Sequence, residues 1–245
     1  MINKVVLITG ASRGIGRAAV KLLCEKGYTV IANYNNSGEE AYNLKDELYR
    51  DGYNIDIIKA DIKNKNDVDQ MIDTIIKKYN TIDILINNAG IAQQKLFTDI
   101  TEDEWDNIFN TNIKSMFYTV KKVLPIMINK KSGKIINISS IWGIAGASCE
   151  VHYSASKAAV IGFSKALAKE TGPSNITVNV IAPGIIDTDM MNTFSQVDKK
   201  QLADDTPLCR LGVPKDIAKC ILYLCSDDSN FLTGQVISPN GGFLI

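Results

Sequence analysis

Tyr153 and Lys157, within Tyr-Ser-Ala-Ser-Lys, are the residues of this chain whose types and spacing could do chemistry. A spacing of four positions puts a phenol and an ammonium on one face of a helix. An ordinary tyrosine titrates near ~10, and lowering its pKa to about 7 takes ~4 kcal/mol of preferential stabilisation of the phenolate. One ammonium ~4 Å away supplies about 1 kcal/mol in water and ~4 kcal/mol at an effective dielectric constant of about 20. Lys157 could therefore make Tyr153 a proton donor in a water-poor cleft, whereas on an open helix face it would simply be solvated.

Ser140 is a second candidate, because it ends an apolar run, Asn137-Ile138-Ser139-Ser140, and precedes Tyr153 by thirteen residues. A loop of that length can fold the serine hydroxyl back beside the phenol, where it would orient a carbonyl oxygen. The alternative is a hydroxyl that only caps the end of a local element.

A glycine-rich run, Thr9-Gly10-Ala11-Ser12-Arg13-Gly14-Ile15-Gly16, follows the first predicted strand and opens a helix. Glycines there let the backbone turn tightly and approach a pyrophosphate, whose charge meets the free N–H groups and positive end of the helix. The spacing is G-x-x-x-G-x-G rather than the commoner G-x-G-x-x-G. Its place between a strand and a helix favours a dinucleotide site over a simple turn.

The elements that must position these residues follow from a repeated pattern. Short β-branched runs alternate with longer amphipathic stretches, which is typical of strands buried on both faces of a parallel sheet and joined by crossover helices. We expect strands at residues 4–9, 28–32, 55–58, 82–86, 134–138, 176–181 and 236–237. The weakly patterned segment 187–207 is predicted to be a mobile lid, with an ordinary surface excursion as the alternative.

Composition bounds the class of protein. At 245 residues and 45% apolar content, the chain is predicted to form a single α/β domain over residues 1–245. Lysine plus arginine and aspartate plus glutamate each number 27, and no basic tract suggests nucleic acid or an acidic membrane surface. Five cysteines without a CxxC pair argue against a disulfide framework and a zinc site. We find no signal-peptide core or long apolar run, and expect a cytoplasmic enzyme with a small-molecule substrate and no metal.

Several motifs in a fixed order resemble those of the short-chain dehydrogenase/reductase family over essentially the full length. They are the glycine run, Asn87-Asn88-Ala89-Gly90, Asn112, Ser140, Tyr153 with Lys157, and Pro183-Gly184 followed by Thr188. The resemblance implies a doubly wound Rossmann fold with a seven-stranded parallel sheet and helices on both faces. It also implies an NAD(P) cofactor and hydride transfer.

The resemblance implies roles for four catalytic residues. Tyr153 would donate a proton to the developing alkoxide, Lys157 would hold the nicotinamide ribose and lower the pKa of the tyrosine, and Ser140 would bind the substrate oxygen. Asn112 would anchor a water that relays protons to Lys157, its alternative being a polar residue inside a helix. The second serine is the catalytic one in the family pattern, so Ser139 is expected to be structural.

The implied cofactor contacts extend beyond the glycine run. Asp61 and Ile62 would hold the adenine, although Asp61 could instead cap a helix. Asn88, Ala89 and Gly90 would flank the ribose and nicotinamide, and the run after the sixth strand would meet the carboxamide. The full expected set is Gly10, Ser12, Arg13, Gly14, Ile15, Gly16, Asp61, Ile62, Asn88, Ala89, Gly90, Tyr153, Lys157, Pro183, Gly184, Ile186 and Thr188.

The phosphorylated cofactor is favoured by the charges near the second strand. Selection of NAD usually places a carboxylate at the end of that strand, whereas NADP requires a cation and no such acid. Here the strand runs into Asn33-Tyr34-Asn35-Asn36-Ser37, with no acid before Glu39. Arg13 in the glycine run could clamp a 2′-phosphate, so we predict NADP(H).

Two substrates fit the resemblance. The stretches 9–16, 207–214, 232–236 and 240–242 are similar to the branch that reduces 3-oxoacyl groups on acyl carrier protein in fatty acid synthesis. Docking of that carrier would need exposed cations near the mouth of the cleft, for which Lys130, Lys131 and Arg210 are candidates. The stretch from Gly146 to Tyr153 is instead similar to the branch that reduces a 5-aminopentanone group on elongation factor P, and Glu150 would suit that cationic ketone. A non-catalytic dinucleotide-sensing protein is a remote alternative.

Two further expectations concern packing and assembly. His152 is the only histidine, and a residue beside Tyr153 on a helix points about 100° away, so we predict a packing or pocket-lining role. The resemblance implies a homotetramer in which helices around residues 101–130 and 153–171 pair. It also suggests that a neighbouring subunit covers the apolar C-terminal residues 243–245.

Overall fold

The protein forms one seven-stranded sheet in which all neighbouring strands run parallel. The computed structural model describes residues 4–53, 55–192 and 194–245. The strand order is β3-β2-β1-β4-β5-β6-β7. The predicted strands are confirmed, with bounds β1 (Val5–Ile8), β2 (Thr29–Tyr34), β3 (Ile55–Lys59), β4 (Ile84–Asn87), β5 (Gly133–Ile138), β6 (Ile176–Ile181) and β7 (Val236–Ile237).

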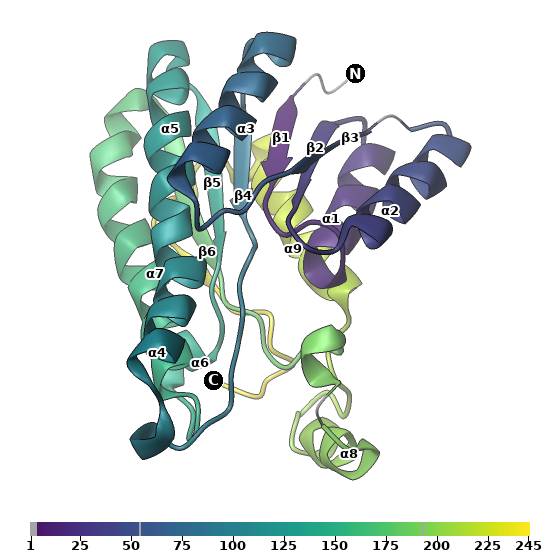
Figure 1. The fold of residues 1–245 in the computed structure, drawn as a ribbon, viewed down its shortest axis with the longest axis vertical. Helices are drawn as coiled ribbons and strands as arrows, with labels where there is room; N and C mark the ends of the chain where they lie inside the picture. The colour runs from purple at the N-terminus through teal and green to yellow at the C-terminus, as the bar shows by residue number, and fades with distance from the viewer. Residues whose placement is uncertain (1–3, 54, 193) are drawn as a thin grey trace.

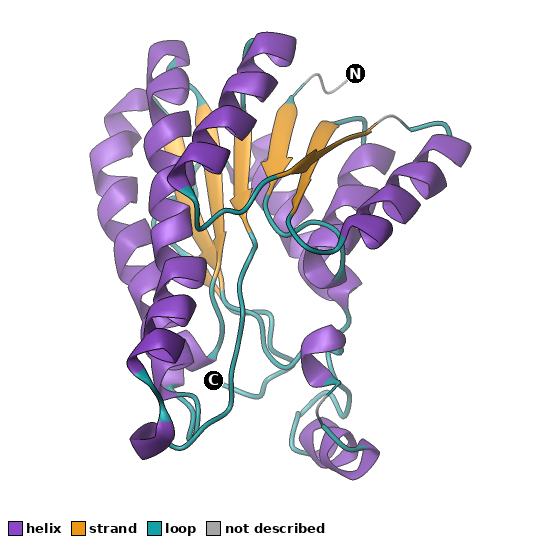
Figure 2. Ribbon diagram, viewed as in Figure 1, coloured by secondary structure: helices purple, strands orange, loops and turns teal. Residues whose placement is uncertain are grey.

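Helices cover both faces of this sheet, as the fold prediction requires (Figures 1 and 2). Successive side chains of a strand point to opposite faces. Val6 and Ile8 of β1 therefore pack in one core with α1 (Gly14–Glu25), α2 (Gly38–Arg50) and α9 (Pro214–Cys225). Val5 and Leu7 pack in the other core with α3 (Lys65–Tyr79), α5 (Ser115–Lys130) and α7 (Val151–Thr171). The apolar runs of the sequence are thus buried from both sides.

Short elements gather where the carboxyl ends of the strands point. They include α4 (Glu102–Phe109), a π-helical turn (Asn110–Lys114), α6 (Trp142–Ala145) and α8 (Gln196–Asp204). Figure 1 shows α4 and α6 on one side of this end and α8 on the other, with the C-terminus between them. The strand order reverses between β1 and β4, and open α/β sheets bind ligands at such a point, outside the carboxyl ends.

The segment predicted to be a lid contains more structure than its sequence suggested. A 3₁₀ turn (Asp189–Met191) precedes α8, which begins with a capping box between Ser195 and Asp198. None of the residues of α8 is buried, so the helix lacks the apolar stripe that sequence patterns detect. Residue 193 lies outside the described residues, and the role of the segment as a lid stays a prediction.

No helix within residues 4–53, 55–192 and 194–245 is both long enough and apolar enough to cross a bilayer.

Candidate active site

The first two turns of α7 bring Tyr153 and Lys157 together. The ammonium nitrogen of Lys157 lies 5.7 Å from the centre of the Tyr153 ring, so the predicted shared face is confirmed. The same nitrogen donates a hydrogen bond of 3.0 Å to the backbone carbonyl of Ile138 at the end of β5. The lysine side chain is buried, which places its charge in the protein rather than in water.

The two serines after β5 make different contacts. Ser140 forms a side-chain hydrogen bond with Tyr153, and its hydroxyl oxygen accepts from the backbone N–H of Trp142 at 3.1 Å. The Ser139 hydroxyl turns the other way and donates to the carbonyl of Lys157 at 2.8 Å. Ser139 therefore ties α7 to the sheet, while Ser140 is the serine that faces the phenol.

Burial shifts the pKa values of the central pair away from each other. Tyr153 keeps part of its surface exposed, yet burial raises the pKa of its phenol to about 12, and the negative charge of Glu150 adds to the rise while the Ser140 hydrogen bond opposes it. Burial lowers the pKa of Lys157 to about 8. The expectation that the lysine lowers the pKa of the tyrosine is wrong for the protein's own groups, because burial raises that pKa and the ammonium of Lys157 donates to the carbonyl of Ile138.

These values still suit a proton donor backed by a proton carrier. A phenol with a pKa of about 12 is protonated at neutral pH, so it can give a proton but cannot act as a base there. A lysine with a pKa of about 8 exchanges its proton close to neutral pH. The pair can therefore deliver a proton through Tyr153 and replace it from Lys157.

Asn112 lies in the π-helical turn, where its side chain is held from two sides. Its amide oxygen accepts from the backbone N–H of Ile91 at 2.9 Å, and its amide nitrogen donates to the Ile91 carbonyl and to the Ser156 hydroxyl, both at 3.0 Å. A β-carbon placed on Gly90 would stand 3.1 Å from the Lys157 nitrogen and 3.2 Å from the Asn112 oxygen. The amide oxygen retains one lone pair beside Lys157, as the predicted water-anchoring role needs.

The glycine run forms a cradle into which larger side chains would not fit. A β-carbon on Gly10, whose φ is +61°, would stand 2.8 Å from the α-carbon of Ala89, and one on Gly16 would stand 2.5 Å from the carbonyl of Gly10. Among the described residues, Arg13 at the N-cap of α1 makes no side-chain bond to the first turn, which also carries no acid. Open N–H groups at a helix start fit a dinucleotide pyrophosphate.

Asn88 and Ala89 are brought against this cradle by a set of short bonds. Both backbone N–H groups donate to the Thr9 hydroxyl at 3.1 Å. The Asn88 amide nitrogen also donates to the carbonyls of Thr9 and Gly10, at 3.0 and 2.9 Å. The end of β4 is thereby fixed beside the end of β1, at the reversal of the strand order.

Residues 183–188, which follow β6, lie between the predicted catalytic serine and the glycine cradle. The carbonyl of Pro183 accepts from Ile141 at 3.0 Å, next to Ser140. Gly184 packs against Asn240 of the C-terminal tail, and the Thr188 methyl carbon would lie 3.5 Å from a β-carbon on Gly14. Ile186, also predicted to bind cofactor, is buried and bridges to Gly212. The run therefore spans the distance between Ser140 and the glycines.

Asp61 and Ile62 occupy the turn after β3. One Asp61 oxygen accepts from Lys63 at 2.9 Å, while Asn64, not Asp61, caps α3. The helix-cap alternative for Asp61 is therefore wrong. Ile62 is buried in the core under α3, so only Asp61 of this pair presents a polar side chain.

The groups that could distinguish the two cofactors lie around the end of β2. Arg13 is exposed, and its side-chain Nε lies 3.8 Å from an oxygen of Asp189 in the predicted lid. Asn33 is buried and bonds the carbonyl of Ala60 at 3.1 Å and the N–H of Gly10 at 3.4 Å. Sequence reasoning missed both Asp189 and this structural use of Asn33, because neither belongs to a local motif.

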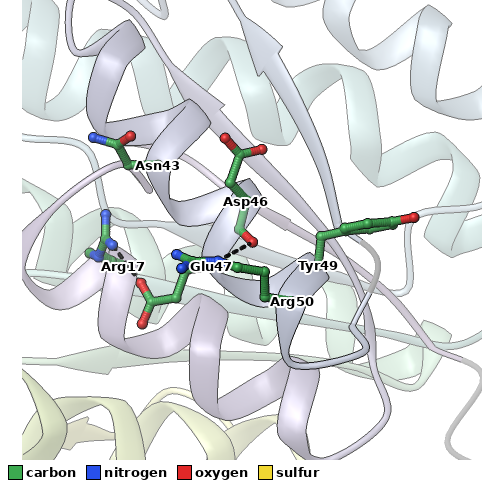
Figure 3. Close-up of a pocket in the computed structure, with 6 residues that line it drawn as sticks. All are labelled: Arg17, Asn43, Asp46, Glu47, Tyr49 and Arg50. Atoms are coloured by element: carbon green, nitrogen blue, oxygen red, sulfur yellow. Dashed lines mark hydrogen bonds and ion pairs between the residues drawn. The ribbon is translucent and has the colours of Figure 1, made fainter.

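A surface hollow of about 560 Å³ lies elsewhere, between α1 and α2 (Figure 3). It is lined by side chains of both charges, and Arg17 is paired there with Glu47 at 2.7 Å. The hollow is shallow and contains none of the predicted catalytic residues. We therefore place the candidate site at the carboxyl ends of the strands and not here.

The candidate docking cations are less suitable than expected. Lys130 and Lys131 lie just before β5, whereas Ser140 lies just after it. These lysines are therefore at the amino ends of the strands, opposite the carboxyl ends where the site lies. Lys130 is paired with the buried Asp83, and Arg210 with Asp216 at 2.7 Å. The placement of Lys130 and Lys131 near the cleft mouth was wrong.

Comparison with known proteins gives matches over nearly the whole chain. The model of the short chain dehydrogenase family matches residues 4–199. A 3-oxoacyl-acyl-carrier-protein reductase of Staphylococcus epidermidis is 41% identical over 241 residues, covering 98% of this chain and 99% of that protein. One from Chlamydia trachomatis is 42% identical over 244 residues, covering 99% and 98%. An uncharacterized oxidoreductase of Bacillus subtilis is 39% identical over 243 residues, covering 99% of both.

Proposed function

This chain belongs to the short-chain dehydrogenase/reductase family and is an oxidoreductase of CH–OH and C=O groups, and from that premise we propose that it reduces a 3-oxoacyl group on acyl carrier protein with NADPH. The observation that carries the proposal is the meeting of Ser140, Tyr153 and Lys157 beside the glycine cradle. Identity near 40% with 3-oxoacyl-acyl-carrier-protein reductases, over nearly the full length of both chains, supports the substrate.

Each catalytic residue has a part that its position supports. Ser140 orients the ketone oxygen, and Tyr153, hydrogen-bonded to Ser140, delivers a proton to that oxygen. Lys157 and Asn112, which meet at Gly90, restore the proton to the phenol. The cofactor, when bound, supplies the hydride. A protein that only sensed dinucleotides would have no need of this set, and NADPH consumption with a simple ketone separates the two cases.

Our proposal of NADPH rather than NADH rests on charge. The end of β2 carries no carboxylate, and Asn33 there is turned into the core. Arg13 is exposed at the start of α1, where its guanidinium is available to a 2′-phosphate. The cradle, Asp61 and the run after β6 would hold the rest of the dinucleotide.

A second substrate is favoured by one observation at the cleft. Glu150 is half-buried, burial raises its pKa, and its charge acts on Tyr153. A carboxylate so close to the proton donor suits a cationic ketone, such as a 5-aminopentanone group on elongation factor P, better than an anionic carrier arm.

The two substrates can be separated in one experiment. Turnover of acetoacetyl thioester on acyl carrier protein and of ketone-modified elongation factor P is measured side by side with NADPH. The main proposal expects the larger kcat/KM for the carrier thioester, and the reverse order selects the second substrate. Absence of turnover with both would overturn the proposed function.

We further propose one Rossmann domain with a lid at 187–207 and a homotetrameric assembly. The short bridge between Asp187 and Lys199 at 3.0 Å and the free-standing α8 support a segment that moves as a unit. Phe243 contacts Trp142 edge to face at 5.8 Å within the same chain, so of the C-terminal residues Ile245 is the one left exposed for a neighbour.

A further inference from the structure

A relay of side chains joins the catalytic helix to the segment after Gly90. His152, next to Tyr153, is 0% exposed, and its Nε2 lies 3.0 Å from the side-chain oxygen of Gln93. The Gln93 amide nitrogen donates to Glu104 of α4 at 2.7 Å. Lys95 in turn donates to both oxygens of Glu104 at 2.8 Å. Four polar side chains thus connect three separate segments.

The chemistry of Glu104 fixes the direction of every bond in this relay. Hydrogen bonds, that of Lys95 foremost, lower the pKa of Glu104 to about 2, so at neutral pH the carboxylate can only accept. Gln93 must therefore present its NH₂ group to Glu104 and its oxygen to His152. Nε2 of His152 must then carry the proton, which leaves Nδ1 as a bare acceptor. That Nδ1 is buried and has no hydrogen-bond partner among the described residues.

The same segment is fastened to the loop before α7 at two more points. The backbone N–H of Lys95 donates to the carbonyl of Cys149 at 2.7 Å, and the Gln94 amide donates to Glu150 at 3.3 Å. Its other end, Ile91, is held by Asn112. The segment 91–95 is therefore held by Asn112 at one end and by the start of α7 at the other.

We propose that Gln93 and His152 are positioning residues, whose directed hydrogen bond fixes the first turn of α7, and with it Tyr153, against the segment 91–95. His152 occupies the position beside Tyr153 but faces away from the reacting atoms, and it acts only through the bond to Gln93. This inference rests on the proposed ketone reduction for its kinetic consequence, whereas the proton on Nε2 can be observed without any activity.

The test uses the full chain and two pairs of variants. Gln93→Met removes both amide bonds at nearly constant shape, and Gln70→Met makes the same chemical change on the exposed face of α3 as a control. His152→Gln keeps a donor at the Nε2 position, whereas His152→Leu removes it. The measurements are kcat and KM with acetoacetyl thioester, the Kd of NADPH, and the ¹⁵N signals of the single imidazole in the wild type and in Gln93→Met.

We expect Gln93→Met and His152→Leu to lower kcat by about tenfold with the Kd of NADPH unchanged, and His152→Gln to keep at least half of the wild-type kcat. The double variant Gln93→Met/His152→Leu should be no worse than Gln93→Met alone, since both substitutions break the same bond between Gln93 and His152. A kcat for Gln93→Met within twofold of the wild type would overturn the inference. If Gln93→Met also weakens NADPH binding, the two histidine variants decide the case. Equal losses of kcat in His152→Gln and His152→Leu would overturn the inference, whereas a kcat retained in His152→Gln and lost in His152→Leu would support it.

The imidazole spectrum decides the case where the wild type reduces no ketone. We expect a neutral ring protonated on Nε2 in the wild type, and a mixture of tautomers once Gln93 is replaced by methionine. A proton on Nδ1 in the wild type would contradict the relay. A wild type that lacks activity but shows the Nε2 proton would end the proposed function and leave the relay standing.

Discussion

Burial moves the two titratable groups of this site in opposite directions, and that sets what each can do. A phenol with a raised pKa holds its proton, and a lysine with a lowered pKa exchanges its proton readily. Proton delivery through Tyr153 leaves a phenolate that is costly in this environment, so replacement of the proton by Lys157 has to follow closely. We propose that Asn112 and Lys157, which both lie close to Gly90, serve that second step.

Substitution of the phenol tests this division of labour. Tyr153→Phe removes the hydroxyl that bonds to Ser140 and keeps the ring that packs beside Lys157. We expect kcat for ketone reduction to fall by about 10²- to 10⁴-fold, because a positioned proton donor contributes that much. The Kd of NADPH, measured by fluorescence titration, should stay the same. A variant as active as the wild type would remove Tyr153 from the mechanism.

Arg13 carries the prediction on cofactor choice. A charge-assisted hydrogen bond to a 2′-phosphate contributes about 1.5–3 kcal/mol, so Arg13→Ala should reduce the NADPH-to-NADH ratio of kcat/KM by about 10- to 100-fold. The loss should fall on NADPH alone. Asp189→Asn serves as the matched control, because it removes the carboxylate now 3.8 Å from Arg13 and should not weaken NADPH binding. An unchanged ratio in Arg13→Ala would show that the phosphate is held elsewhere.

At the scale of elements, the first turns of α7 carry a buried charge that lowers the stability of the folded protein. Lys157 is buried with its pKa lowered from 10.5 to about 8, which corresponds to a cost of up to about 3 kcal/mol at neutral pH for keeping the ammonium. Tertiary contacts, including the Ser139 bond to the Lys157 carbonyl, hold the helix in place despite this cost. Function and stability therefore oppose each other in this helix.

The pH dependence of unfolding reports on this opposition. Between the folded pKa of about 8 and the unfolded value of 10.5, the unfolded chain binds the Lys157 proton and the folded chain does not. Stability contributed by this group therefore rises with pH through that window. In urea unfolding at pH 7, Lys157→Met should be more stable than the wild type. The variant should be inactive, and its free energy of unfolding should lack the rise with pH that Lys157 contributes. If the difference in free energy of unfolding between Lys157→Met and the wild type did not shrink between pH 8 and pH 10, the lowering of the Lys157 pKa by burial would be contradicted.

The elements also show what sequence reasoning can reach. The seven strands were predictable because each is a short run rich in apolar and β-branched residues between helical stretches, and the cradle because its glycines lie close together in sequence. The helix α8 was not, since none of its residues is buried and no apolar stripe marks it. The relay through Gln93 was out of reach as well, because its partners are 9 to 59 residues apart in sequence and meet only in the folded protein.

The whole molecule presents exposed apolar side chains on both faces of the sheet. Phe117 and Ile128 are exposed on α5, and Tyr223 and Phe231 are exposed on and just after α9. Because α5 and α9 cover opposite faces, these residues lie in two separate surface regions, one over each face. A closed tetramer with two-fold axes needs two different self-complementary interfaces, and we expect each region to supply the apolar patch of one of them.

Assembly can therefore be dissected one patch at a time. We expect the wild type to sediment as a tetramer, and Phe117→Glu and Phe231→Glu each to sediment as a dimer, because a carboxylate buried in one interface is unpaired there and leaves the other interface intact. The double variant should be monomeric. Circular dichroism is the control that each variant remains folded, since neither phenylalanine belongs to a core. Wild-type protein that sediments as a monomer would rule out the assembly, and a single variant that stays tetrameric would remove its patch from the interface.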